Sequence, residues 1–290
     1  MLVRPPHTFP SAATLQRAAA DGPHTGAGVV TGSSPRIGTG QAAFVLFIHQ
    51  KDRMISSTYT KPTQILAFDI FGTVVDWHTG ISSEVQALCP GVDGGAFALA
   101  WRAGYQPAMR RVRSGELGWT LIDDLHRLIL DDVLKTFELS DLTEGQKQHL
   151  NKAWHRLDPW PDVMAGLVRL KSRYTICTLS NGNLGLLTHM AKRAGLPWDC
   201  ILSAEVFKAY KPDPATYLGV ARVFGVTPAE VMLVAAHQDD LASARACGLQ
   251  TAYIERPAEF GMAHPKDVSP DSANTRHAKD FLKLADQLGC

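Results

Sequence analysis

Four groups of polar residues that are far apart in the sequence could together perform nucleophilic chemistry. Asp69, Ser180-Asn181 and Asp240 each lie at or shortly after the end of a short apolar run, and Lys211 lies between the last two groups. A carboxylate that faces a lysine stays ionised and is held in place, and its partial removal from water raises its reactivity. The pattern therefore predicts covalent catalysis in which Asp69 is the nucleophile.

Alternating strand and helix patterns predict the elements that position these residues. Short runs of apolar residues predict five strands, at 65–68, 174–179, 200–203, 231–235 and 250–254. Helical patterns are found at 163–172, from 184 to the glycine at 195, from 214 to the glycine at 225, and at 240–247. Such repetition is typical of a parallel sheet with helices on both faces. Ligands bind beyond the carboxyl ends of parallel strands, so we expect the polar groups in one crevice.

The stretch 79–157 interrupts this alternation with helical patterns alone. One predicted helix carries apolar residues at helical spacing: Leu121, Leu125, Leu128, Ile129 and Val133. Another begins at Thr143, which forms a capping box with Gln146. The sequence predicts an α/β fold, a doubly wound parallel sheet with a Rossmann-like core from 61–78 and 158–290. The stretch 79–157 is expected to form an inserted helical cap.

Residues 1–60 differ from the rest in composition. They are rich in proline and glycine and show no persistent apolar period, which predicts disorder or a loosely attached extension. Few acids and several arginines are also typical of a transit peptide. The simpler interpretation is that translation starts at Met54, so that removal of residues 1–53 leaves stability and turnover unchanged.

Charge and cysteine content exclude several classes of function. The 29 Lys and Arg residues balance 28 Asp and Glu residues to a net charge of +1, so we expect neither nucleic acid nor a membrane surface as a partner. The longest apolar run within the first 60 residues, 42–48, is too short to cross a bilayer. The five cysteines are odd in number and form no CxxC pair, which favours a cytoplasmic location without structural disulfides or zinc.

The candidate residues resemble the four motifs of the haloacid dehalogenase superfamily, in order and over roughly residues 64–285. The motifs read Asp69-Ile-Phe-Gly-Thr73, Ser180-Asn181, Lys211-Pro-Asp213 and Asp240. Phosphatases of this superfamily have a second aspartate where this chain has Phe71, and a further carboxylate where it has Ala236. Phosphoryl transfer needs metal and a general acid. The resemblance therefore implies neither a phosphatase nor a metal or other cofactor.

Within the superfamily the chain is similar to the type II 2-haloacid dehalogenases. Asp69-Ile-Phe-Gly-Thr-Val-Val-Asp-Trp77, Trp101-Arg102, Ser180-Asn181-Gly182 and Tyr210-Lys-Pro-Asp213 with Tyr217 carry this similarity. It implies that Asp69 displaces halide from C2 of a small-molecule haloacid and that water, oriented by Asp240 and its neighbours, hydrolyses the resulting ester.

The same resemblance implies roles for the other candidate residues. Arg102 and Asn181 bind the departing halide, and Ser180 and Lys211 hold the substrate carboxylate. Thr73 supports the nucleophile, Phe71 lies in the substrate site, and Tyr217 brings its hydroxyl near Lys211. Catalytic roles thus fall on Asp69, Lys211 and Asp240, and the others bind substrate.

One motif departs from the usual type II pattern. Many members have Ser-x-Asn-x-x-Asp where this chain has Ala235-Ala-His237-Gln-Asp-Asp240. This motif and the stretch Trp101-Arg-x-Gly-Tyr-Gln-Pro107 resemble a branch with fluoroacetate-hydrolysing members. We expect His237 either to orient the hydrolytic water or to bind fluoride.

Two alternative functions stay open at this point. The same nucleophile could open a strained ring such as an azetidine carboxylate, which release of chloride from 2-chloropropanoate would distinguish. A non-catalytic relative is the other alternative, although the intact Asp69, Lys211, Ser180 and Asp240 favour an enzyme. A homodimer is also left open.

Overall fold

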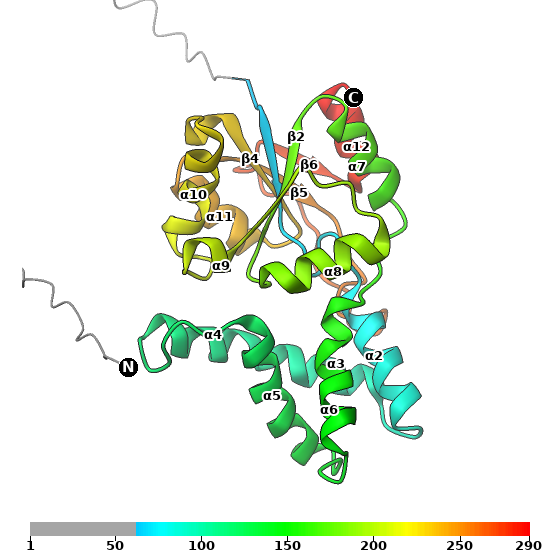
Figure 1. The fold of residues 1–290 in the computed structure, drawn as a ribbon. Helices are drawn as coiled ribbons and strands as arrows, with labels where there is room; N and C mark the ends of the chain where they lie inside the picture. The colour runs from blue at the N-terminus through cyan, green and yellow to red at the C-terminus, as the bar shows by residue number, and fades with distance from the viewer. Residues whose placement is uncertain (1–61) are drawn as a thin grey trace, which may run out of the picture. The chain divides into compact units, whose positions relative to one another are not determined.

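A six-stranded parallel sheet forms the centre of the protein, as seen in a computed structural model that describes residues 62–290 (Figure 1). The interpretations of residues 1–60, including a start at Met54, lie outside the described residues. The strands are β1 (Ile65–Phe68), β2 (Thr175–Ser180), β3 (Cys200–Ser203), β4 (Val231–Ala235), β5 (Gln250–Ile254) and β6 (Arg276–Ala278). Their order is β3-β2-β1-β4-β5-β6. β1 therefore lies between β2 and β4, which brings three of the predicted polar groups to neighbouring strand ends.

Helices pack on both faces of the sheet, so both faces are buried. Successive side chains of a strand point to opposite faces, and a strand such as β1 therefore contributes to both apolar clusters. Leu66 and Phe68 of β1 belong to one apolar cluster and Ile65 and Ala67 to another. The first cluster packs against α7 (Val163–Lys171), α8 (Leu184–Ala194) and α12 (Phe281–Leu288). The second packs against α10 (Pro214–Phe224) and α11 (Gln238–Ala246). This arrangement confirms the predicted doubly wound sheet.

The chain between β1 and β2 forms the inserted helical cap (Figure 1). Its helices are α2 (Trp77–Leu88), α3 (Gly94–Ala103), α4 (Tyr105–Arg113), α5 (Ile122–Thr136), α6 (Glu144–Asn151) and the short 3-10 helix η1 (Lys152–His155). The capping box of α6 forms as predicted, with Gln146 N–H donating to Thr143 Oγ1. The prediction that Leu128 belongs to the apolar face of α5 is wrong, because its side chain is 48% exposed.

Two elements at the C-terminal end of the chain had no predicted counterpart. β6 has only three residues, Arg276–Ala278, and two of them are polar, so it shows no apolar run. α12 begins after Asp280, whose side chain accepts a hydrogen bond from Lys283 N–H, and packs against α7. Across residues 62–290, no helix has the length and apolar character needed to cross a bilayer.

Candidate active site

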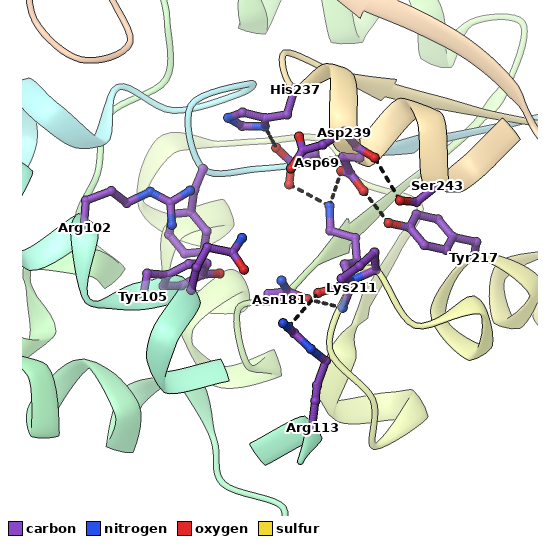
Figure 2. A pocket seen from close by; sticks show the side chains of 14 residues that line it. Asp69, Arg102, Tyr105, Arg113, Asn181, Lys211, Tyr217, His237, Asp239 and Ser243 are labelled. Atoms are coloured by element: carbon purple, nitrogen blue, oxygen red, sulfur yellow. Dashed lines mark hydrogen bonds and ion pairs between the residues drawn. The ribbon is translucent and has the colours of Figure 1, made fainter. Parts of the chain in front are cut away.

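A cavity of about 310 Å³ lies at the carboxyl ends of the central strands and contains side chains from both the sheet and the cap (Figure 2). The predicted site residues that line it are Asp69, Phe71, Arg102, Asn181, Lys211, Tyr217, His237 and Asp240. Ser180 and Thr73 are fully buried behind this lining. The structure therefore brings together residues that are up to 171 positions apart in the sequence, as the strand-end pattern predicts.

Asp69 is held in a fixed orientation directly after β1. Its backbone N–H donates to Val234 O of the neighbouring strand at 3.0 Å. Thr73 Oγ1 donates to Asp69 Oδ2 at 2.8 Å and is itself positioned by the Ala236 N–H at 2.9 Å. Lys211 Nζ donates to the other carboxylate oxygen, Oδ1, at 2.9 Å. The turn that follows β1 and the lysine thus fix one oxygen each.

The pKa of Asp69 lies well below its ordinary value. Burial alone would raise this pKa, but the charge of Lys211 and the hydrogen bond and charge of His237 lower it by more. A carboxylate that is buried and still ionised is surrounded by little water that would have to be displaced. This is the state required of a carboxylate nucleophile.

Lys211 lies between two carboxylates. Its Nζ donates to Asp69 Oδ1 and, at 2.5 Å, to Asp240 Oδ2, while Tyr217 donates its hydroxyl to Asp240 Oδ1 at 2.7 Å. Burial lowers the pKa of Lys211, but the charges of Asp240 and Asp69 raise it above its ordinary value, so the ammonium is retained. The pKa of Asp240 is raised, because burial and the nearby Asp69 charge outweigh the effect of Lys211. Asp240 is therefore the more basic of the two carboxylates.

Arg102 extends from α3 into the cavity (Figure 2). Its guanidinium carbon lies 4.2 Å from the centroid of the Tyr105 ring and 5.7 Å from that of the Trp77 ring. Within residues 62–290, no acceptor forms a hydrogen bond with the Arg102 guanidinium. The aromatic rings thus hold the cation over their faces and leave its N–H groups available to an anion.

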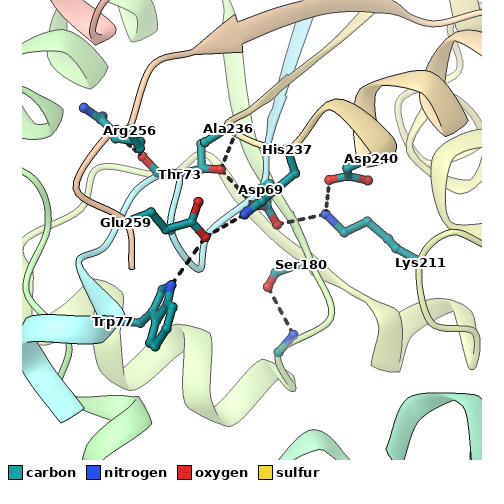
Figure 3. A network of polar contacts seen from close by, with 12 residues as sticks. Asp69, Thr73, Trp77, Ser180, Lys211, Ala236, His237, Asp240, Arg256 and Glu259 are labelled. Atoms are coloured by element: carbon teal, nitrogen blue, oxygen red, sulfur yellow. Dashed lines mark hydrogen bonds and ion pairs between the residues drawn. The ribbon is translucent and has the colours of Figure 1, made fainter. Parts of the chain in front are cut away.

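Asn181 and Ser180 follow β2 and have different surroundings. Asn181 Oδ1 accepts the Lys211 N–H at 2.8 Å, while its Nδ2 contacts the Met109 sulfur at 3.3 Å. A thioether is a weak acceptor, so this amide can donate to a stronger one. Ser180 Oγ accepts the Gly182 N–H at 3.1 Å and supports the turn (Figure 3). No contact of Ser180 with the cavity is seen.

A group of charged residues beside Asp69 was only partly predicted (Figure 3). His237 Nδ1 lies 3.1 Å from Asp69 Oδ2, and its Nε2 lies 2.7 Å from Oε1 of the fully buried Glu259. Lys266 Nζ donates to Glu259 Oε2 at 2.5 Å, and Trp77 Nε1 donates to Oε1 at 3.4 Å. Both ring nitrogens of His237 therefore have carboxylate partners.

Glu259 and Lys266 have no motif that would identify them in the sequence. Glu259 lies in the loop that follows β5, at the same edge of the sheet as the other polar groups. Applying the strand-end rule to the predicted strand 250–254 would have included this loop among the candidates. Tyr105 was likewise not assigned, although it lies three residues after Arg102 on the neighbouring helix.

Comparison with known proteins identifies the family of this chain. Residues 63–248 match the model of the haloacid dehalogenase-like hydrolases. The chain belongs to this family. It is 32% identical to (S)-2-haloacid dehalogenase 4A of Burkholderia cepacia over 205 residues, which cover 68% of this chain and 86% of that protein.

Two solved structures resemble this haloacid dehalogenase-like hydrolase more strongly in sequence. A defluorinating L-2-haloacid dehalogenase is 45% identical with a TM-score of 0.76, over 79% of this chain and 96% of that one. Another L-2-haloacid dehalogenase is 44% identical with a TM-score of 0.75, over 79% of this chain and all of that one. The protein is therefore a hydrolase of the 2-haloacid dehalogenase class.

Phe71 of this haloacid dehalogenase-like hydrolase stands at the position where the sequence resemblance predicts a second aspartate in phosphatases. The Phe71 ring lies edge-on to the Trp154 ring, with 5.7 Å between the centroids, and is almost fully buried. The apolar Phe71 ring therefore occupies this position without supplying a carboxylate. In the part of the chain that the structure describes, no three His, Cys, Asp or Glu side chains come together as metal ligands.

Proposed function

We propose that this protein hydrolyses short 2-haloacids to 2-hydroxyacids through an ester on Asp69. The observation that carries the proposal is the buried, ionised Asp69 carboxylate, held at 2.9 Å by Lys211 in a cavity that Arg102 also lines. The similarity to a (S)-2-haloacid dehalogenase over most of the chain supports the same substrate class.

In the first step, Asp69 Oδ1 attacks C2 of the substrate. The C–O bond forms as the carbon–halogen bond breaks, and the electron pair of that bond leaves on the halide. Arg102 and the Asn181 amide receive the halide, because the Arg102 guanidinium forms no hydrogen bond within residues 62–290 and Asn181 Nδ2 contacts the weakly accepting Met109 sulfur. The substrate carboxylate is held by the third N–H of Lys211, the one that donates to neither Asp69 nor Asp240, while Ser180 supports the turn behind the cavity.

In the second step, water hydrolyses the ester. The water oxygen bonds to the carboxyl carbon of Asp69 as a water proton passes to Asp240, whose raised pKa makes it a suitable acceptor. The bond between that carbon and Oδ1 then breaks, and Oδ1 leaves as the hydroxyl oxygen of the product, which takes the proton from Asp240. The remaining water proton is released when the Asp69 carboxyl group ionises.

We further propose that the substrates include fluoroacetate. A relative that is 45% identical is described as defluorinating. Fluoride is a small, strongly hydrated leaving group, so cleavage of the C–F bond depends on concentrated hydrogen-bond donation. The stacked Arg102 guanidinium, together with Asn181, offers such donors at one end of the cavity.

Halide release tests the proposed function. The wild-type protein should release halide from fluoro-, chloro- and bromoacetate and from one or both enantiomers of 2-chloropropanoate, with one 2-hydroxyacid formed per halide. In a single turnover in ¹⁸O-labelled water, the label should appear in the Asp69 carboxylate. Asp69→Asn should fold and release no halide. Label found only in the product would show direct attack by water and contradict the ester mechanism.

A further inference from the structure

Glu259 is placed to control the protonation of His237. Its carboxylate is completely buried and receives hydrogen bonds from His237, Lys266 and Trp77. Burial alone would raise the pKa of Glu259, but the charges and hydrogen bonds of His237 and Lys266 lower it to about 2. Glu259 therefore carries its negative charge throughout the ordinary pH range.

His237 lies between two carboxylates, and its ring has no other polar partner within residues 62–290. Nδ1 lies 3.1 Å from Asp69 Oδ2 and Nε2 lies 2.7 Å from Glu259 Oε1. Because a carboxylate can only accept, both nitrogens donate when the ring is an imidazolium. Burial would lower the pKa of His237, but the charge of Glu259 and the hydrogen bonds of both carboxylates raise it to about 9.

The two oxygens of Asp69 are not equivalent. Oδ2 accepts from Thr73 Oγ1 at 2.8 Å and from His237 at 3.1 Å, whereas Lys211 is the one side chain of the described residues that donates to Oδ1. The less occupied Oδ1 is the oxygen that can form the ester. Oδ2 then becomes the carbonyl oxygen of that ester, and the negative charge develops on it when water adds to the carboxyl carbon.

Ester formation changes what keeps the proton on His237. Once Asp69 is an ester, its negative charge is gone and it no longer attracts the imidazolium. Glu259 is then the carboxylate that still holds the proton. Without it, the ring would be neutral at the stage when a donor to Oδ2 is needed, and a neutral imidazole is a weaker donor than an imidazolium.

We propose that Glu259 is a positioning residue that holds His237 as an imidazolium, and that His237 and Thr73 form the oxyanion hole for hydrolysis of the Asp69 ester. This inference rests on the proposed function. During hydrolysis, His237 Nδ1–H and Thr73 Oγ1–H donate to Oδ2, while the proton transfers run through Asp240 as described above. Neither donor gives up its proton.

The matched variants Glu259→Gln and Glu255→Gln test this role. Glu255 forms an equivalent pair with a histidine, since its Oε1 lies 2.7 Å from His277 Nε2, and it does not line the cavity. Glu259→Gln should keep a burst of one halide per site, because ester formation does not need the oxyanion hole. Its steady-state rate should fall by about 10²-fold, as for the loss of one oxyanion-hole donor. Glu255→Gln should behave as the wild type.

The pH dependence separates this role from a purely structural one. The imidazolium is the active form, so hydrolysis is retained below the pKa of His237 and lost above it. In the wild type, this loss should occur below pH 9, because the ester lacks the Asp69 charge that helps to raise the pKa of His237 to about 9 in the free protein. In Glu259→Gln it should shift down by more than one pH unit, with fluoride and bromide substrates slowed alike. An unchanged profile, or an equal loss of ester formation and hydrolysis, would overturn the proposal.

An NMR titration of the wild-type protein gives a result that needs no folded Glu259 variant. The ring signals of His237, assigned through their loss in His237→Asn, should titrate above pH 8 in the free protein. A pKa of 6.5 or below for the His237 ring would overturn the proposal. The titration involves no substrate, so its result does not depend on the proposed function. The proposed function itself fails if the wild type releases no halide from any haloacid.

Discussion

The Arg102 guanidinium shows how a single residue can be held without using its hydrogen-bond donors. It rests on the face of Tyr105 and near that of Trp77, and its N–H groups stay free for an anion. A lysine at this position has a compact ammonium that neither stacks on an aromatic ring in the same way nor offers a planar set of donors. The shape of the cation therefore matters for the leaving group as much as its charge.

Arg102→Lys should slow the release of halide in the first step. We expect a loss of about 10²-fold in the burst rate, the effect of one misplaced charge-stabilising donor, with a smaller change in KM. Rapid-mixing measurements of halide release would test this. Arg111→Lys is the control, because Arg111 is exposed and pairs with Glu116. Equal effects of the two substitutions would contradict a role for Arg102 in receiving halide.

Tyr217→Phe should move the acid limb of the activity profile to higher pH. The Tyr217 hydroxyl donates to Asp240 Oδ1 at 2.7 Å and thereby favours the ionised carboxylate. Without it the pKa of Asp240 rises further, so the base becomes protonated, and inactive, at a higher pH. A shift of about one pH unit in the kcat profile is expected. Tyr174→Phe, which removes a hydroxyl that donates to Leu288 O, should cause no shift.

At the scale of elements, the site depends on the contact between the turn after β1 and the loop after β5. Gly72 in the turn has a φ of +84°, and a Cβ atom there would collide with the Glu259 carboxylate. Arg256 of the loop donates to Thr73 O at 2.9 Å and forms two hydrogen bonds of 2.9 Å with Asp162. These contacts hold the turn after β1 and the loop after β5 together next to Asp69.

Gly72→Ala should lower both stability and turnover. The positive φ costs about 1–2 kcal/mol for a residue with a Cβ atom, and the overlap with Glu259 adds about 1–3 kcal/mol. Gly91→Ala is the matched control, because Gly91 has a φ of +96° and open space around it. It should cost about 1–2 kcal/mol and leave turnover unchanged. Denaturant unfolding and steady-state kinetics would measure both. Normal turnover in a folded Gly72→Ala protein would show that the contact is dispensable.

The elements that the sequence predicted are those with a strong local pattern. β1 and β3–β5 have the predicted limits, and β2 is displaced by one residue, because each is a short, mostly apolar segment between turn residues. β6 is too short to show such a run. Asp69, Lys211 and Asp240 could be placed together because parallel strands end at one edge. The ion pairs of Glu259 could not be foreseen, since they depend on the path of an irregular loop.

For the whole molecule, the buried charges predict a limited pH range of greatest stability. His237 has a pKa raised from 6.5 to about 9, so its stabilisation is complete below pH 6.5 and is lost as the pH rises to 9. Glu259 has a pKa lowered from 4.5 to about 2, so its stabilisation is complete above pH 4.5 and is lost towards pH 2. Both contributions are complete between pH 4.5 and 6.5.

Thermal unfolding across pH would test this range. The free energy of unfolding should fall by about 3 kcal/mol between pH 6.5 and 9 through His237, on the basis of its pKa shift. In Glu259→Gln the fall over the same interval should be smaller, since the larger of the two charges that raise the pKa of His237 is absent. A wild-type protein that is equally stable at pH 6.5 and 9 would contradict the assignment of an imidazolium.

The ion pairs of Glu259 also determine when the site can form during folding. Asp69 and Glu259 lie 190 positions apart, and closing so long a loop is slow relative to forming local helices. The site is complete only after β5 has joined β4 and the loop beyond it has settled on Gly72. Upon refolding from denaturant, helical circular dichroism should therefore recover before halide release does. Activity would then report the final docking of β5 and the loop that follows it, rather than the formation of secondary structure.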